Sequence, residues 1–446
     1  MNRALRQSRR TFLVGSGAAL AVGCARPLVA GTLSADESQV PRAELLQSQP
    51  RPAPPIALPT DQLAVPSGPK KRVAAITTTY FKYSHADDII TKFIEGYGVV
   101  GRVHEPHCQV VSLYVEQSPN TDIGRGMAKR YRIPLVETVA DALTQGGDDL
   151  AVDAVLLVGE HGDYPLNDKG QKLYPRRRLF EEIVKVFRQT GRTVPVFNDK
   201  HLSYSWDNAR WMVDQAGELD FPLMAGSSVP VTWRRPPLAF RPGISLESAL
   251  VMGSGGFESY GFHCLELLQA FAERRSGGAT GVRAVQALEG DEAWRAAKAG
   301  RWPAHLVPAA IAPVPSHRKR PFELEQLRRS VVFRIEYSDG FEAAVCMSGG
   351  IVSEFCFAAS IQGRSEPVAT WAYLPKPQRD HFSFLCNHIE VMFRSGKPSY
   401  PVERTLLVTG VLDALHDSRA AGGKRVVTPH LSDLNYRPAD EFGVTG

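Results

Sequence analysis

Short apolar runs alternate with helical patterns from residue 71 to residue 226, and this alternation constrains the fold more than any other feature of the chain. The run "VDAVLLVG" at 152–159 is apolar almost throughout and predicts a strand that is buried on both faces. The segment "RRRLFEEIVKVFRQTG" at 176–191 has the spacing of an amphipathic helix that ends at a glycine. Strands and helices that alternate at these lengths form parallel βαβ units. We therefore expect an α/β fold in which residues 71–226 form a doubly wound parallel sheet.

The pattern changes after residue 226. A helical segment at 256–275 carries His263, with Glu266 one turn later on the same face. Long strand-like segments follow, among them "RSVVFRIEYSDG" and "FEAAVCMSGG". Antiparallel strands with a layer of helices make an α+β domain, which we expect at residues 227–430. Two amphipathic helices near its end are predicted to pack back on the first half, and residues 431–446 are predicted to be a tail.

Paired arginines and a short apolar stretch lie at the start of the chain. The stretch "SRRTFLVGSGAALAVGCA" contains Arg9 and Arg10, then glycine- and alanine-rich apolar residues, then small residues suited to cleavage. This apolar run is too short to span a membrane. We expect residues 1–30 to be a twin-arginine signal peptide that exports the protein to the periplasm, with lipid attachment at Cys24 as the lesser alternative. Residues 31–70 are rich in proline and are expected to be a disordered spacer.

Charge and cysteine content argue against several classes of protein. The formal net charge of +5 comes largely from dispersed arginines, so we expect no nucleic-acid partner. Besides Cys24 the chain has five widely spaced cysteines and no CxxC pair, which argues against a disulfide framework and a structural zinc site. Cys346 and Cys356 are either paired across neighbouring strands or buried as free thiols. We expect no metal site.

A polar run, Asn198–His201, follows the predicted strand "TVPVF" without a turn-forming glycine or proline. In doubly wound sheets, ligands bind beyond the carboxyl ends of the strands. The polar run therefore predicts one wall of a binding crevice.

The first strand-to-helix turn, "ITTTYFKYSHADD" at 76–88, lacks the glycines with which dinucleotide-binding folds approach a pyrophosphate. The hydroxyls of Thr77, Thr78 and Thr79 are the remaining candidates for contacts with a phosphate. Glu116, at the end of the second predicted strand, has the position of a ribose-binding acid. These four residues are the cofactor-binding candidates that the residues alone suggest.

Four stretches resemble the Gfo/Idh/MocA family, the relatives of glucose-fructose oxidoreductase and inositol dehydrogenase. In chain order they are "MAKRYRIPLVETVADAL", "VDAVLLVGEHGDYP", "NDKHLSYSWDNARWMVDQA" and "ESYGFHCLELL". The resemblance extends over residues 72–428 and implies a Rossmann-like domain followed by a domain with an open, mostly antiparallel sheet. Two departures stand out, because the glycine motif is degenerate and His201 replaces the proline that follows the family's lysine.

The resemblance also implies roles for single residues. It puts Lys200 and His263 at the catalytic positions and His161 at the strand tip beside the cofactor. In this chemistry His263 takes the proton of a substrate hydroxyl, Lys200 stabilises the oxygen, and a hydride passes to a tightly bound NAD or NADP. The implied substrate is a small-molecule carbohydrate or polyol, and the candidates for binding it are Asp199, Tyr204, Arg234 and Glu258.

Three classes of function stay open. The first is an exported oxidoreductase of this type that acts on a carbohydrate or polyol. The second is a sugar lyase or glycosidase on the same scaffold, and the third is a non-catalytic carbohydrate-binding protein that has lost the cofactor. The missing glycines favour the latter two, whereas Lys200 and His263 favour the first two. We also expect a homo-oligomer formed through the C-terminal sheet.

Overall fold

The computed structural model describes residues 68–99, 102–317, 321–375, 379–439 and 444–445. The predicted signal peptide and all but the last three residues of the predicted spacer lie outside this part of the chain. Within it, no helix combines the length and the apolar character needed to cross a membrane.

The first sheet has six parallel strands in the order β5-β4-β1-β6-β7-β8. The strand order reverses between β1 and β6, which is the switch point at which doubly wound sheets bind ligands. The predicted doubly wound parallel sheet is therefore confirmed. The strands are β1 (Lys71–Thr77), β4 (Cys108–Val115), β5 (Leu135–Val136), β6 (Ala154–Val158), β7 (Val196–Asp199) and β8 (Leu223–Gly226).

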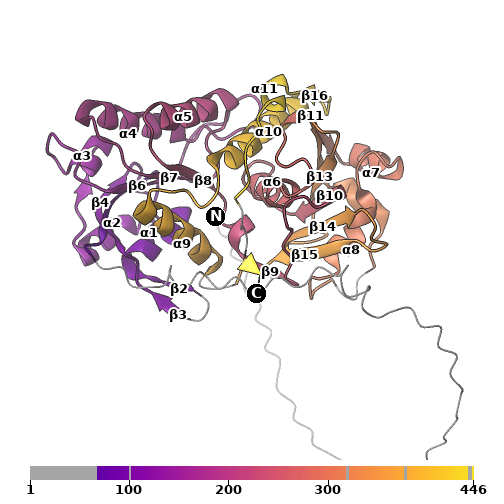
Figure 1. Ribbon diagram of the computed structural model, residues 1–446, viewed down its shortest axis with the longest axis horizontal. Coiled ribbons are helices and arrows are strands. Elements are labelled where there is room, and N and C mark those ends of the chain that lie inside the picture. Colours follow the sequence, from indigo (N-terminus) through magenta and orange to yellow (C-terminus); the bar gives the residue numbers. More distant parts are fainter. Residues whose placement is uncertain (1–67, 100–101, 318–320, 376–378, 440–443, 446) are drawn as a thin grey trace, which may run out of the picture. The chain divides into compact units, whose positions relative to one another are not determined.

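Helices cover both faces of the first sheet (Figure 1). Alternate residues of β1 point to opposite faces, so Val73 and Ala75 belong to one core and Ala74 and Ile76 to another. The first core lies under α1 (His85–Glu95), α2 (Gly124–Tyr131) and α9 (His381–Ser395). The second lies under α3 (Val139–Thr144), α4 (Arg176–Thr190) and α5 (Trp206–Glu218).

The second sheet has nine strands in the order β16-β11-β12-β13-β10-β14-β15-β9-β17. Only the β10–β13 and β9–β17 pairs are parallel, so the predicted mostly antiparallel sheet is confirmed. The strands are β9 (Trp233–Arg235), β10 (Leu246–Gly253), β11 (Val282–Glu289), β12 (Val331–Tyr337), β13 (Glu342–Met347), β14 (Phe355–Ile361), β15 (Val368–Ala372), β16 (Val426–Val427) and β17 (Val444–Thr445).

Helices also cover both faces of this second sheet. One face packs on α6 (Ser259–Ala272) and α10 (Val402–Ala420), and the other on α7 (Asp291–Lys298) and α8 (Val307–Ile311). The remaining elements are short: a two-stranded pair β2 (Tyr97–Val99) and β3 (Arg102–His104), the 3-10 helices η2 (Val229–Val231), η3 (Ala304–Leu306) and η4 (Leu324–Arg329), and α11 (Pro429–Ser432).

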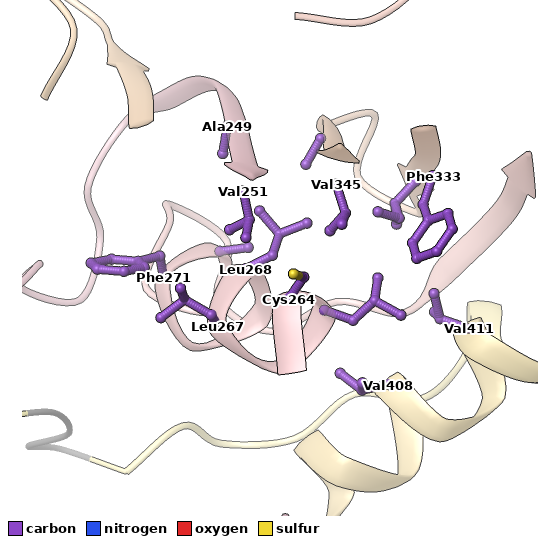
Figure 2. Packing of buried hydrophobic residues seen from close by; sticks show 14 of the residues in the cluster. Ala249, Val251, Cys264, Leu267, Leu268, Phe271, Phe333, Val345, Val408 and Val411 are labelled. Atoms are coloured by element: carbon purple, nitrogen blue, oxygen red, sulfur yellow. The ribbon is translucent and has the colours of Figure 1, made fainter. Parts of the chain in front are cut away.

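The core beneath α6 is shown in Figure 2, where side chains of α6 and α10 meet those of the second sheet. Phe271 stacks on Phe357 with ring centroids 3.8 Å apart and planes 14° apart. A large apolar side chain that is fully buried stabilises the fold by about 1.5–3 kcal/mol. Cys264 lies in the same core, and all five described cysteines are buried free thiols. Cys346 and Cys356 are not paired, because β10 lies between their strands.

Helix α10 is not amphipathic, contrary to the prediction from its sequence. Fourteen of its 19 residues are buried, because it packs on α5 and β8 of the first half and on α6 and β11 of the second. Figure 1 shows α10 running between the two halves. A helix that is buried on most of its surface has no continuous polar face for sequence periodicity to detect.

A buried ion pair anchors α10 to the end of α6. Arg404 donates from Nε to Glu273 Oε2 at 2.9 Å and from Nη2 to Oε1 at 2.6 Å. The two side chains are only 1% and 0% exposed. Because the pair is bidentate and shielded from water, each charge depends on the other.

Arg404→Met is expected to lower the free energy of unfolding by about 3–5 kcal/mol, because Glu273 would stay buried without its partner. The double change Arg404→Met with Glu273→Met should recover most of this loss, since no unpaired charge remains. Arg210→Ala, which removes an exposed pair with Asp214, is the matched control and should cost less than about 1 kcal/mol. Urea unfolding monitored by fluorescence measures all three, and a single-variant loss no larger than the control's would contradict this account.

Candidate active site

A cavity of about 950 Å³ lies between the carboxyl ends of the first sheet and the second sheet. The first half contributes residues that follow β1, β6, β7 and β8, and the second half contributes residues of α6, β14, β15 and the start of α9. A second cavity, of about 320 Å³, adjoins it and shares Glu160, Lys200 and Ser259. The larger cavity has the position predicted for the crevice.

The polar run of residues 198–201 is partly strand rather than loop. β7 extends two residues beyond the apolar run, through Asn198 and Asp199. The side chains of all four residues in the polar run are buried. The amide of Asn198 donates to the carbonyls of Asp199 and His201, at 2.7 and 3.3 Å, and the Lys200–His201 peptide is cis. Lys200 lines both cavities, and His201 lines the smaller one.

Lys200 forms a buried ion pair with Glu160, which follows β6. Lys200 Nζ lies 2.6 Å from Glu160 Oε1, and the side chains are 2% and 5% exposed. Arg176 Nη2 lies 3.5 Å from the other carboxylate oxygen and donates to the carbonyl of Lys200 at 3.0 Å. Burial alone would raise the pKa of Glu160, but Lys200, His85 and Arg176 hold that pKa well below its usual range. Glu160 is therefore ionised at neutral pH.

His85, at the start of α1, lies beside this pair. Its Nδ1 is 2.7 Å from Asp199 Oδ2 and 3.8 Å from Glu160 Oε2. Burial opposes its protonation, yet the carboxylates of Asp199 and Glu160 raise the pKa of His85 above its ordinary value. Asp199, predicted to bind substrate, thus contacts His85 and is not among the residues that line either cavity.

His263 of α6 lines the larger cavity, as Lys200 does. Its Nδ1 lies 2.5 Å from Ser227 Oγ, and its ring centroid lies 6.3 Å from that of His85. Burial, with the charges of Lys200 and His85, holds the pKa of His263 well below its usual range. The structure therefore brings the two predicted catalytic residues to one cavity and keeps the imidazole neutral.

His161 also lines the larger cavity, next to Glu160. Its backbone is left-handed, with φ of 70°, and its ring meets the ring of His85 edge-on at 5.6 Å. Burial lowers the pKa of His161 to about 4. Among the described residues, His85, Glu160 and His161 are the one group whose ligand atoms come close enough together to hold a metal ion.

The other predicted substrate-binding residues are dispersed. Glu258 lines the smaller cavity, where it accepts from the Lys172 N–H at 2.9 Å and lies 3.5 Å from His201 Nε2. Tyr204 and Arg234 line neither cavity. The Arg234 guanidinium donates to the carbonyls of Leu238 and Pro230 and lies over the ring of Phe271, with its pKa lowered to about 9 by burial and by neighbouring arginines.

Four aromatic side chains that the sequence motifs did not indicate also line the larger cavity. They are Tyr260 of α6, Phe355 of β14, Trp371 of β15 and Tyr373. Tyr260 and Phe355 are nearly parallel, with planes 11° apart. Aromatic faces of this kind suit the C–H surfaces of sugars and polyols.

The residues predicted to bind a dinucleotide instead form hydrogen bonds or ion pairs within the protein, or are buried. The hydroxyls of Thr77 and Thr78 donate to the carbonyls of Val158 and Glu160, at 3.0 and 2.8 Å, and Thr79 is buried. Glu116 pairs with Arg178 and accepts from the Tyr164 hydroxyl at 2.6 Å. None of these four candidates lines either cavity.

The turn after β1 is closed where a pyrophosphate would need to approach. The Ile123 N–H donates to the carbonyl of Tyr80 at 2.7 Å, which joins this turn to the segment after β4. At the N-terminus of α1, Ser84 caps the helix and the Asp87 carboxylate accepts from the Tyr83 N–H at 2.8 Å. A helix N-terminus that already holds a carboxylate offers little to a second anion. These residues do not fit a dinucleotide bound across β1.

Glu266, one turn after His263, lies behind the site. Its Oε2 accepts from the Ser227 N–H at 2.6 Å, and its Oε1 lies 2.6 Å from Thr405 Oγ1. The Thr405 hydroxyl has one hydrogen and lies 2.9 Å from the carbonyl of Ala225. When it donates there, its bond to Glu266 requires a proton on the carboxyl group. Burial correspondingly raises the pKa of Glu266 to about 7.

The free energy of unfolding is expected to fall as pH rises from about 4.5 to about 7, because folded Glu266 keeps a proton that the unfolded chain has lost. Glu266→Gln mimics the protonated acid and should remove this contribution, which is on the order of 3 kcal/mol. The difference between variant and wild type, measured by urea unfolding at several pH values, isolates the effect. The exposed Glu325→Gln is the control, and an equal change in both variants would contradict the assignment.

No protein-family model matches the chain, and no curated protein matches it. Among solved structures, GenD2 from gentamicin A biosynthesis, in complex with NAD, is similar with a TM-score of 0.51 and 15% identity over 82% of this chain and 99% of that one. The myo-inositol 2-dehydrogenase from Lactobacillus plantarum has a TM-score of 0.47 and 11% identity over 80% of this chain and 99% of its own. At such identities the likeness to GenD2 shows a shared fold alone. The two-sheet architecture that the resemblance to the Gfo/Idh/MocA family implies is thereby confirmed.

Proposed function

We propose that the protein is an acid–base enzyme that acts on a carbohydrate or polyol, with His263 as the base and Lys200 as the electrostatic partner. The observation that carries the proposal is that a neutral His263, the buried Lys200–Glu160 pair and four aromatic side chains line one cavity. A cavity of about 950 Å³ has the size of a ligand-binding site.

In this mechanism His263 donates Nδ1–H to Ser227 Oγ, and its Nε2 takes a proton from the substrate. In a lyase this proton comes from a carbon beside a carbonyl, and the bond to a leaving group on the next carbon breaks. In an oxidoreductase it comes from a hydroxyl whose carbon gives up a hydride to the cofactor. Lys200 stabilises the negative charge that develops on the substrate oxygen. Glu160 holds the ammonium group in place, because it is the buried carboxylate in contact with Lys200.

Proton abstraction of this kind serves a sugar lyase without a nicotinamide cofactor, which agrees with the closed turn after β1. The second candidate is an oxidoreductase with tightly bound NAD or NADP. The observation that favours it is the fold shared with a solved structure in complex with NAD. A carbohydrate-binding protein without activity is the outcome if neither chemistry is found.

Two measurements separate these candidates. The purified protein is denatured and the supernatant is examined for nicotinamide by absorbance and mass spectrometry. The native protein is then incubated in D₂O with a panel of polyols, glycosides and uronic acids, and deuterium incorporation and products are followed by NMR. Bound nicotinamide would favour the oxidoreductase, whereas exchange or elimination without it supports the acid–base enzyme.

His263→Ala and Lys200→Met are each expected to lower the rate on an identified substrate by about 10²–10⁴-fold, because each removes one group that acts on the transferred proton or the oxyanion. His305→Ala changes an exposed histidine of the same half and should leave the rate unchanged. If both site variants retained the wild-type rate while folding normally, the assigned roles would be wrong.

Export by the twin-arginine route is also part of the proposal, and the paired Arg9 and Arg10 support it. Replacing both with lysine in the full-length chain should abolish its appearance in the periplasmic fraction of a bacterium that has this machinery. Replacing Arg3 and Arg6 with lysine is the matched control and should leave export intact. Export that survived the first pair of changes would contradict the signal assignment.

A further inference from the structure

We propose that His85, Glu160 and His161 bind one divalent transition-metal ion on the floor of the larger cavity. One ligand atom from each of the three lies within 4.8 Å of the others. A metal bound at about 2.1 Å from each ligand separates its ligands by roughly 3–4 Å, so only small side-chain movements are needed to form the site.

The three residues have atoms free to bind the ion. Glu160 Oε2 and His161 Nε2 are buried and have no hydrogen-bond partner. His85 Nδ1 lies 2.7 Å from Asp199 Oδ2 and 3.8 Å from Glu160 Oε2. If Nδ1–H donates to Asp199, Nε2 is the nitrogen that offers a lone pair to the ion. Arg176 Nη2 lies 3.5 Å from Glu160 Oε2 without a hydrogen bond between them. Buried polar atoms are normally hydrogen-bonded, so the two acceptors on Glu160 and His161 require an explanation. A bound cation supplies one.

The residues behind the three proposed ligands have the arrangement that metal sites use. The Asp199 carboxylate orients the His85 ring through Nδ1, and Lys200 holds Glu160 through the carboxylate oxygen that is not free. His161 has a left-handed backbone with φ of 70°, a conformation that non-glycine residues adopt rarely and mostly at functional sites. The rare backbone conformation therefore occurs at one of the three proposed metal ligands.

Two imidazole nitrogens and one carboxylate oxygen suit zinc, iron(II), cobalt(II) or manganese(II) better than calcium or magnesium. Three protein ligands leave coordination positions open toward the cavity that the same residues line. Lys200 and Arg176 add positive charge nearby, so we expect weaker binding than at a structural zinc site and a preference for an anionic or hydroxyl ligand on the ion. Two adjacent oxygens of a polyol would fill such positions.

Metal binding is tested directly, without substrate. The protein is treated with a chelator, dialysed, and titrated with Zn²⁺ and Mn²⁺ by calorimetry and with Co²⁺ by visible absorption. We expect one ion per chain and cobalt bands typical of nitrogen and oxygen ligands. His161→Ala and Glu160→Gln are each expected to weaken binding at least tenfold, since outer contacts alone change affinity by 10–100-fold.

His381→Ala is the matched control, because His381 is a buried histidine of the same cavity that lies outside the group of three. Circular dichroism and thermal unfolding establish that each variant is folded, and His161→Gln replaces any variant that is not. No binding by the wild type, or equal binding by wild type and both ligand variants, would overturn the proposal. Because no turnover is measured, this result stands whether or not the proposed acid–base function holds.

Discussion

The buried pair of Lys200 and Glu160 is the interaction on which the site depends. The two residues follow neighbouring strands, β7 and β6, so their charges meet only because these strands lie side by side in register. Burying the charge of Lys200 or Glu160 without a partner would cost several kcal/mol. Each of the two residues therefore needs the other in this buried position. His85 and Arg176 lie beside the same carboxylate, at 3.8 and 3.5 Å from Glu160 Oε2.

Much of the fold could be predicted from the sequence, because apolar periodicity reports directly on which faces are buried. The parallel sheet and the later antiparallel sheet follow from this periodicity, whereas the catalytic roles of Lys200 and His263 are implied by the resemblance to the Gfo/Idh/MocA family. Lys200 could be located because it follows a buried strand, and the carboxyl ends of parallel strands meet at one edge. The motif order then singled out His263 on α6, which packs against the second sheet.

The rest of the site depends on contacts that no local pattern encodes. His85 meets Asp199 across 114 residues, and this contact requires the strand order β1-β6-β7, which periodicity does not give. Glu160 precedes the noted His161 and could have been found from its place at a strand end. Arg234 resembled a ligand-binding arginine, but its guanidinium donates to two backbone carbonyls and lies over the ring of Phe271. Composition cannot distinguish this structural role from ligand binding.

The position of α10 between the two halves has a consequence for how the molecule responds to ligands. Because this helix packs on α5 and β8 as well as on α6 and β11, neither sheet can lose its structure without exposing the apolar surface of the other. The two halves should therefore melt in a single transition. A molecule bound in the cavity they share would raise the melting temperature of the whole chain, which makes thermal shift a simple way to search for the substrate.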